Sequence, residues 1–152
     1  MTPAVEAAKE AGIDFRLHAY DGVELGDGDY ALAVARRLEI EPRRLFKTLV
    51  VSVEGKLQVF VLPGDRQLSL RAAGKRAELA GRGEAERATG YVVGGISPLG
   101  QRRALPVTVD VSALEHETVL VSAGRRGLQI ELCPRDLVCL TGAAVRPLTA
   151  GE

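Results

Sequence analysis

Apolar and polar residues alternate, or β-branched residues cluster, in several short stretches of this chain. Both patterns are typical of β-strands. They predict strands over 15–18, 46–53, 56–62, 107–110, 118–122 and 128–132. Glu54-Gly55 separates the second strand from the third, and the segment 123–127 separates the last two, so we expect two β-hairpins.

Other segments carry apolar residues at helical spacing between a capping residue and a glycine. They predict helices over 3–12, from Asp27 or Asp29 to about Leu38, from Ser69 to about Leu79, over 84–89 and over 134–142, with one helical turn at 112–115. We expect the segment 81–83, with its two glycines, to stop the third helix. The acidic, glycine-rich stretch from Asp21 to Asp29 is expected to be a loop.

Hairpins interleaved with helices predict an α+β fold. We expect a mixed, mostly antiparallel sheet, curved or barrel-like, surrounded by helices, and not a doubly wound parallel sheet. With 152 residues, 46% of them hydrophobic, the chain can bury one sizeable core but is too short for two ordinary domains. The prediction is therefore a single domain over residues 1–152.

One stretch stands out for its glycines, GYVVGGISPLGQ from Gly90 to Gln101. Its apolar run at 91–93 predicts a short strand that leaves the core, and the four glycines and Pro98 predict a tightly constrained loop after it. Free N–H groups in such a loop can bind anions or stabilise an oxyanion. The glycines are equally compatible with a sharp structural connection, and neither a dinucleotide fingerprint nor a Walker motif fits them.

The charged residues indicate possible binding surfaces only where basic residues occur in groups. Twenty basic and twenty acidic residues cancel, so no overall field draws the chain to nucleic acid or to a membrane. Basic residues do recur in groups, at Arg43-Arg44, Arg71 with Lys75-Arg76, Arg102-Arg103 and Arg125-Arg126. Each group is either an RNA contact or an ordinary solvated surface. The chain shows no signal segment and no apolar stretch of about 18 residues, so we expect a cytoplasmic protein.

Lys47 is the most informative residue outside the glycine-rich loop. Side chains alternate along a strand, so Lys47 shares a face with Leu49 and Val51. A lysine on an apolar face is costly unless it reaches a cleft or an anionic partner. Lys47 is therefore either an edge lysine that extends to solvent or a point charge for a phosphate or carbonyl group.

Residues that could form a covalent intermediate are poorly supported. His18 and His116 have no acid or nucleophile at motif spacing, and no serine lies in a G-x-S-x-G motif. Cys133 and Cys139 fit neither a redox motif nor a zinc half-site, and we expect reduced thiols without a chemical role. Asp136 falls in the first turn of the last helix, where an acid favours the helix dipole. We expect catalysis by positioning, without metal or cofactor.

Three segments, FKTLVV, TGYVVGGISPLGQ and SAGRRGLQIELCPRDL, resemble the YbaK group of aminoacyl-tRNA deacylases. That group is similar to the editing domain of bacterial prolyl-tRNA synthetases, and the similarity covers nearly the whole chain. It implies a barrel-like mixed sheet and a free-standing enzyme that hydrolyses mischarged tRNA(Pro), above all Cys-tRNA(Pro). It also implies that the substrate's own thiol attacks the ester. Mischarged tRNA(Pro) is the implied partner, and prolyl-tRNA synthetase is a candidate partner.

The resemblance also implies roles for individual residues. Lys47 would contact the 3′-terminal adenosine or its phosphate. The family's G-x-x-x-P loop would correspond to Gly94, Gly95, Ile96, Ser97 and Pro98, with backbone amides that hold the aminoacyl carbonyl. Tyr20 and Asp136 would line the same pocket. The candidates for RNA binding are Arg102, Arg103, Arg125 and Arg126.

Two departures from the family pattern leave the substrate open. The acidic loop from Asp21 to Asp29 replaces a histidine-bearing loop, and Ala123 stands where a glycine is usual. Because pocket-lining loops select the amino acid, another mischarged residue such as alanine remains an alternative. A non-catalytic module that binds tRNA or a synthetase is a second alternative. A hydrolase for another small acyl ester is the third.

Overall fold

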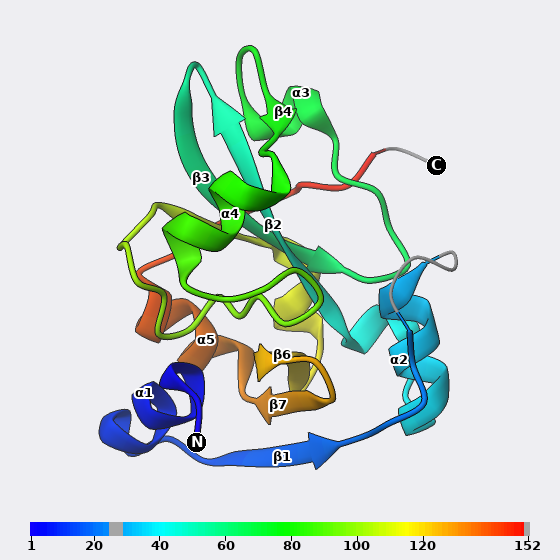
Figure 1. The fold of residues 1–152 in the computed structure, drawn as a ribbon. Helices are drawn as coiled ribbons and strands as arrows, with labels where there is room; N and C mark the ends of the chain where they lie inside the picture. Colours follow the sequence, from blue (N-terminus) through cyan, green and yellow to red (C-terminus); the bar gives the residue numbers. More distant parts are fainter. Residues whose placement is uncertain (25–28, 151–152) are drawn as a thin grey trace.

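The strands of this protein form two β-sheets (Figure 1). The computed structural model describes residues 1–24 and 29–150. A three-stranded antiparallel sheet has the order β1-β7-β6, and a five-stranded mixed sheet has the order β4-β2-β3-β5-β8. The first sheet consists of β1 (Phe15–Ala19), β6 (Val119–Arg125) and β7 (Leu128–Leu132). The second consists of β2 (Phe46–Val53), β3 (Lys56–Pro63), β4 (Glu78–Leu79), β5 (Val107–Asp110) and β8 (Ala144–Arg146).

Both predicted hairpins are present. Strands β2 and β3 are joined by Glu54 and Gly55, which have φ angles of 51° and 82°. Two successive positive φ angles are typical of the tight turn that matches the twist of antiparallel strands. The second hairpin is tighter than predicted, because β6 continues to Arg125 with a shift of register after Ser122.

The free edge of β2 is paired only at its two ends, and the bridge at its start joins the two sheets. At the start of the strand, Leu45 forms a parallel bridge with Leu120 of β6. Near the far end, β4 pairs with Val51 and Ser52. Between these points, residues 46–49 pair with β3 on one side, and no described strand pairs with them on the other. One strand edge is therefore open in the middle of the molecule.

Helices surround the sheets, as predicted (Figure 1). They are α1 (Pro3–Ala11), α2 (Tyr30–Leu38), α3 (Leu70–Ala73), α4 (Arg82–Thr89) and α5 (Pro134–Thr141), with 3-10 turns η1 (Pro42–Arg44) and η2 (Val111–Glu115). Thr2 and Asp29 cap α1 and α2 through their side-chain oxygens, as expected of these residue types. Asp27, the other proposed cap, lies outside the described residues. None of the described helices is long and apolar enough to cross a membrane.

The predicted helix from Ser69 to Leu79 is wrong. Helix α3 ends after one turn at Gly74, whose φ is 146°. A Cβ at this glycine would lie 2.5 Å from Cγ1 of Val53, so the chain passes close to β2 and then adds β4 to the sheet. Gly81 begins α4 as its N-cap and does not end a helix. The predicted strand at 91–93 is likewise absent, and this segment is a loop.

The largest hydrophobic cluster lies between the two sheets and includes Phe46, Val50 and Ile130. Val51, on the opposite face of β2, packs in a separate cluster with Phe60. A third, smaller cluster joins α2 to the bridge between the sheets. Strand β2 thus has apolar residues on both faces, and Lys47 and Thr48 interrupt this pattern at the open edge.

A polar network around Glu131 holds the three-stranded sheet to η1. Its carboxylate accepts hydrogen bonds from Arg44 at 3.0 Å and from Thr118, and lies 2.7 Å from Nε2 of His18. Burial alone raises the pKa of Glu131. The hydrogen bonds from Thr118 and His18 and the charge of Arg44 outweigh burial, so the pKa is lowered below its ordinary value of 4.5.

We expect this network to make stability depend on pH. A carboxyl group whose pKa is lowered by folding stabilises the protein above its ordinary pKa, and this stabilisation is lost as the pH falls through the folded value. Glu131→Gln should therefore be less stable than the wild type at neutral pH, and the difference should shrink below pH 4.5. Urea unfolding at several pH values measures it. A difference that is constant over this range would contradict the assignment.

Candidate functional site

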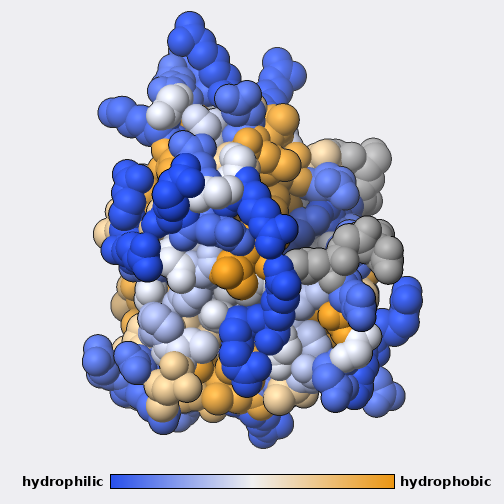
Figure 2. All heavy atoms as spheres, in the orientation of Figure 1, coloured by the Kyte–Doolittle hydropathy of each residue, from blue (hydrophilic) through white to orange (hydrophobic). Residues whose placement is uncertain are grey.

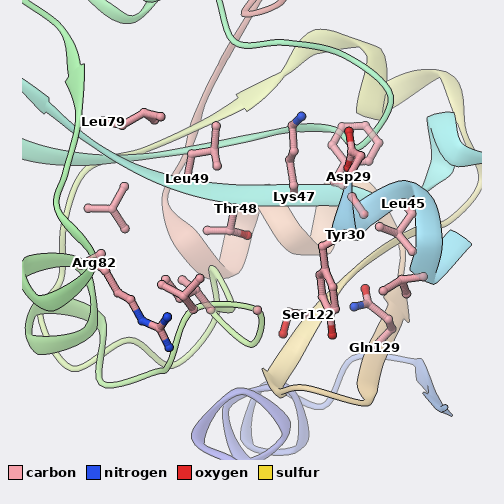
Figure 3. Close-up of a pocket in the computed structure, with 18 of the residues that line it drawn as sticks. Asp29, Tyr30, Leu45, Lys47, Thr48, Leu49, Leu79, Arg82, Ser122 and Gln129 are labelled. Atoms are coloured by element: carbon pink, nitrogen blue, oxygen red, sulfur yellow. The ribbon is translucent and has the colours of Figure 1, made fainter. Parts of the chain in front are cut away.

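A cavity of about 330 Å³ opens beside the unpaired edge of β2 (Figure 3). This volume is within the range of small-molecule sites. Its walls come from the start of α2, from β2, from β4 and α4, from the loop at 93–96, and from β6 and β7. Segments that are far apart in the sequence therefore meet at one open strand edge. The predicted site residues that line it are Lys47, Gly94 and Ile96.

The loop from 91 to 100 is held by its own hydrogen bonds. The buried Tyr91 hydroxyl donates to the carbonyl of Leu99 at 2.6 Å, and burial raises the pKa of Tyr91 to about 12. The Gly95 amide donates to the carbonyl of Val92 at 2.8 Å. Ser97 is buried, and its hydroxyl accepts from the Leu99 amide at 3.2 Å. The amide of Gly95 and the hydroxyl of Ser97 therefore support the loop itself.

The peptide groups of Val93 are held from two sides. Its amide donates to Glu86 of α4 at 2.8 Å, and its carbonyl accepts from Nε of Arg126 at 2.9 Å. The hydrogen bond from Val93 lowers the pKa of Glu86, burial opposes this, and Arg82 lowers the pKa further. Glu86 and Arg126 thus fix the chain just before Gly94.

Two amides of this loop are available to a ligand. Gly94 and Ile96 line the cavity, and the structure shows no hydrogen-bond partner for either backbone N–H among the described residues. Fixed N–H donors that face a cavity are the groups that stabilise an oxyanion, because they need no reorganisation when negative charge develops. Within the predicted loop, the N–H groups of Gly94 and Ile96 therefore have no partner in the described structure, whereas the N–H group of Gly95 is used by the loop itself.

Gly95 is required because the loop packs closely on another part of the backbone. A Cβ at this position would lie 2.7 Å from Cα of Arg125 and 2.9 Å from the amide nitrogen of Arg126. The glycine allows the loop to pack directly on the backbone of the β6–β7 turn. Its lack of a side chain serves packing within the protein, and Gly95 does not line the cavity.

Two polar side chains in the cavity wall have no partner. Oγ1 of Thr48 and Oε1 of Gln129 are buried and make no hydrogen bond in the described structure, and Gln129 is only 4% exposed. Each such group costs about 1–3 kcal/mol when left unsatisfied. Figure 3 shows Gln129 beside Ser122 and the hydroxyl end of Tyr30. Together these groups give the cavity a polar end with two available acceptors.

Sequence reasoning missed Thr48 and Gln129 as site residues. A weak signal exists for Gln129, because it interrupts the apolar positions of LQIEL in a strand that is buried on both faces. Thr48 gives a similar signal within FKTLVVSV. Polar residues at such positions are usually satisfied within the core, so only the three-dimensional arrangement shows that both face one cavity.

Lys47 lies at the rim of the cavity. It leaves β2 on the side opposite to Thr48 and points away from Tyr30, Ser122 and Gln129 (Figure 3). Burial lowers the pKa of Lys47, while the charges of Asp29 and Asp65 oppose this change. Its ammonium group can therefore contact an anionic group at the mouth of the cavity.

The remaining predicted residues lie outside the lining of this cavity. The hydroxyl of Tyr20 is 3.2 Å from that of Tyr30, and burial and then this hydrogen bond raise the pKa of Tyr30. Tyr20 therefore does not line the cavity but contacts Tyr30, which does. Pro98 is buried within the loop. Asp136 is in the first turn of α5, which packs against η2, so the structure does not bring it to the cavity.

The predicted RNA-binding arginines are all exposed, which leaves their side chains accessible. The backbone amides of Arg102 and Arg103 bond to Thr89 and Ala88 at the end of α4. Arg125 and Arg126 form the β6–β7 turn against the loop. The two cysteines are free thiols, and neither lines the cavity.

Gly95→Ala should destabilise the protein by about 1–3 kcal/mol, because the added methyl group overlaps backbone atoms that cannot move independently. Gly81→Ala is the matched control, since its Cβ would have no neighbour within 4 Å and its φ is −63°. That change should stay within about 0.5 kcal/mol. Urea unfolding of both variants provides the comparison. Equal, small effects would mean that the loop does not pack on the turn as described.

Comparisons with known proteins show the family to which this chain belongs. A family model described as "Aminoacyl-tRNA editing domain" matches residues 27–140. An Enterococcus faecalis protein named "Putative Cys-tRNA(Pro)/Cys-tRNA(Cys) deacylase EbsC" is 37% identical over 128 residues, which cover 80% of this chain and 78% of the relative.

Solved structures show the same fold. The crystal structure of hypothetical protein APE2540 has a TM-score of 0.85 and 29% identity, covering 97% of this chain and 99% of that one. The "Crystal structure of a putative trans-editing enzyme for prolyl tRNA synthetase" has a TM-score of 0.81 at 23% identity and covers 99% of both chains. These likenesses confirm the predicted α+β fold, and the family match agrees with the resemblance found in the sequence. The chain belongs to the family of aminoacyl-tRNA editing domains.

Proposed function

We propose that this protein is a deacylase that removes the wrong amino acid from tRNA(Pro), with Cys-tRNA(Pro) as its main substrate. Support comes from the family, from the name of the Enterococcus faecalis relative, and from the site. The observation that carries the proposal is a cavity lined both by two loop residues whose N–H groups have no partner and by two buried, unpartnered side-chain oxygens. Such a substrate implies a protein that acts in the cytoplasm.

The polarity of the cavity matches an aminoacyl ester. The ester carbonyl would accept hydrogen bonds from the amides of Gly94 and Ile96, which would also hold the oxyanion as it develops. The α-ammonium group of the amino acid needs acceptors, and Oγ1 of Thr48 and Oε1 of Gln129 are buried and unpartnered. One aminoacyl group can thus satisfy both sets of unpaired atoms.

The attacking group would come from the substrate. The residues that line the cavity include neither cysteine nor histidine, and the hydroxyl of Ser122 already accepts from the Gly124 amide at 3.2 Å. The cysteinyl sulfur would attack its own carbonyl carbon, forming a C–S bond. The ester C–O bond breaks, the thiol proton passes to the ribose oxygen, and water later opens the cyclic thioester. A reactant held in this way gains a large effective molarity.

Residues around the cavity would then have supporting roles. Lys47 at the rim is proposed to meet the terminal nucleotide or its phosphate. Tyr20 would hold Tyr30 in place, and the exposed arginines would contact the RNA backbone. Glu86 and Arg126 would position the loop amides through Val93.

The test is to incubate the protein with tRNA(Pro) charged with cysteine, serine, alanine or proline and to follow loss of the ester. The cysteine ester should be cleaved fastest, because serine is a poorer nucleophile. A double variant with Cys133→Ser and Cys139→Ser should keep this activity, because neither residue lines the cavity. Loss of activity in this variant would indicate an enzyme nucleophile. Equal rates for the cysteine and serine esters would favour attack by water. Faster cleavage of the alanine ester would mean that Ala-tRNA(Pro), and not Cys-tRNA(Pro), is the main substrate.

Glu86→Ala should lower kcat by about tenfold, because the Val93 peptide is no longer fixed and the Gly94 amide turns away from the oxyanion. Complete removal of an oxyanion donor typically costs a hundredfold or more. Glu84→Ala is the matched control, since Glu84 is an exposed residue on the same helix. Single-turnover rates and KM should be measured for both variants, and Glu86→Gln should recover part of the rate. If Glu86→Ala raises KM and leaves kcat unchanged, Glu86 does not position the reacting groups.

A further inference from the structure

Leu79 is an exposed apolar residue at the rim of the cavity. It is 61% exposed, although it belongs to a strand and lines the cavity wall. Leu79 pairs directly with Val51 of β2, and paired residues of antiparallel strands point to the same face. Lys47 and Leu49 lie on that face as well, because they alternate with Val51. Figure 3 shows all three labelled side chains on the same side of β2, and Figure 2 shows apolar surface in the region of β4.

The cavity therefore has two unlike parts. Thr48, Ser122 and Gln129 form the polar end, whereas Lys47, Leu49 and Leu79 form an outer apolar surface with a cation at one side. The free amides of Gly94 and Ile96 also line this cavity. If the aminoacyl group occupies the polar end, as the proposed function requires, the rest of the substrate leaves over the outer part.

That remaining part is a nucleoside with a phosphate on its 5′ side. Its base presents a broad apolar face, which binds to apolar side chains without regard to sequence. Its phosphate carries the negative charge that the ammonium group of Lys47 can meet. Arg82 also lines the cavity, on the other side of β2, and its Nε donates to Glu86 at 3.4 Å. The chemistry of this surface fits a terminal nucleotide.

We propose that Leu79, together with Leu49, forms the surface on which the terminal base of the tRNA packs when its amino acid is in the cavity. This inference rests on the proposed function for the direction in which the substrate lies. Contacts of this kind are equally strong in the ground state and in the transition state. They lower KM and leave kcat unchanged.

Leu79→Ala should raise KM for charged tRNA by about tenfold without changing kcat, since one apolar contact is lost. Leu114→Ala is the matched control, because Leu114 is 49% exposed on η2 and does not line the cavity. The same kinetics should be measured with cysteine ethyl ester, which has no nucleoside. Leu79→Ala should not affect its hydrolysis. An unchanged KM for charged tRNA would overturn the proposal, as would an equal rise in KM for both substrates.

A binding experiment separates this inference from the proposed function. An uncharged RNA hairpin that ends in CC followed by 2-aminopurine reports on its terminal base by fluorescence. The wild-type protein and Leu114→Ala should change this fluorescence on binding, and Leu79→Ala should reduce the change. If no charged tRNA is hydrolysed but the Leu79-dependent signal is present, the nucleotide surface stands and the proposed reaction fails. If hydrolysis occurs and the signal is the same in all three proteins, the base does not pack on Leu79.

Discussion

The site depends on a strand edge that the fold leaves unpaired. Backbone groups on an open edge would ordinarily invite pairing with another strand. In this protein the bridge from Leu45 to Leu120 closes one end of the gap, and the pairing of Val51 with Leu79 closes the other. A ligand can therefore enter between the sheets, while a further strand of ordinary length has no room to pair. The same edge places Thr48 in the wall of the cavity and Lys47 at its rim, because side chains alternate along β2.

The glycine-rich loop completes this arrangement from the opposite side. Its shape is set by the contact of Gly95 with the β6–β7 turn and by the two hydrogen bonds of Val93. These contacts come from α4 and from the second hairpin, so the orientation of the free amides depends on a helix before the loop and on a hairpin after it in the sequence. The loop is therefore held both by its own hydrogen bonds and by contacts from outside its own sequence.

Long, regular patterns predicted much of the fold. The β2–β3 hairpin, the caps Thr2 and Asp29 and the last helix needed only local periodicity and local capping chemistry. The helix from Ser69 to Leu79 was wrong, because the close passage of Gly74 beside Val53 is a contact between distant segments. The strands β4 and β8 are too short to carry a periodic signal. For the site, the glycines of the loop and the apolar face shared by Lys47 drew attention to these residues, and the family resemblance gave them proposed roles. Gln129 was missed, and Asp136 was predicted to line the pocket although it does not. The pattern within one strand or helix does not show which residues of other elements lie close to it.

The unpartnered oxygens of Thr48 and Gln129 have a consequence for the evolution of this chain. Apolar residues of similar size at these two positions would remove the cost of burying polar atoms without partners, so they would favour a more stable folded state in the absence of ligand. Selection for stability alone would therefore favour their loss. Under the proposed function, their presence is a trade-off in which the protein gives up part of its folding free energy to keep two acceptors for its ligand.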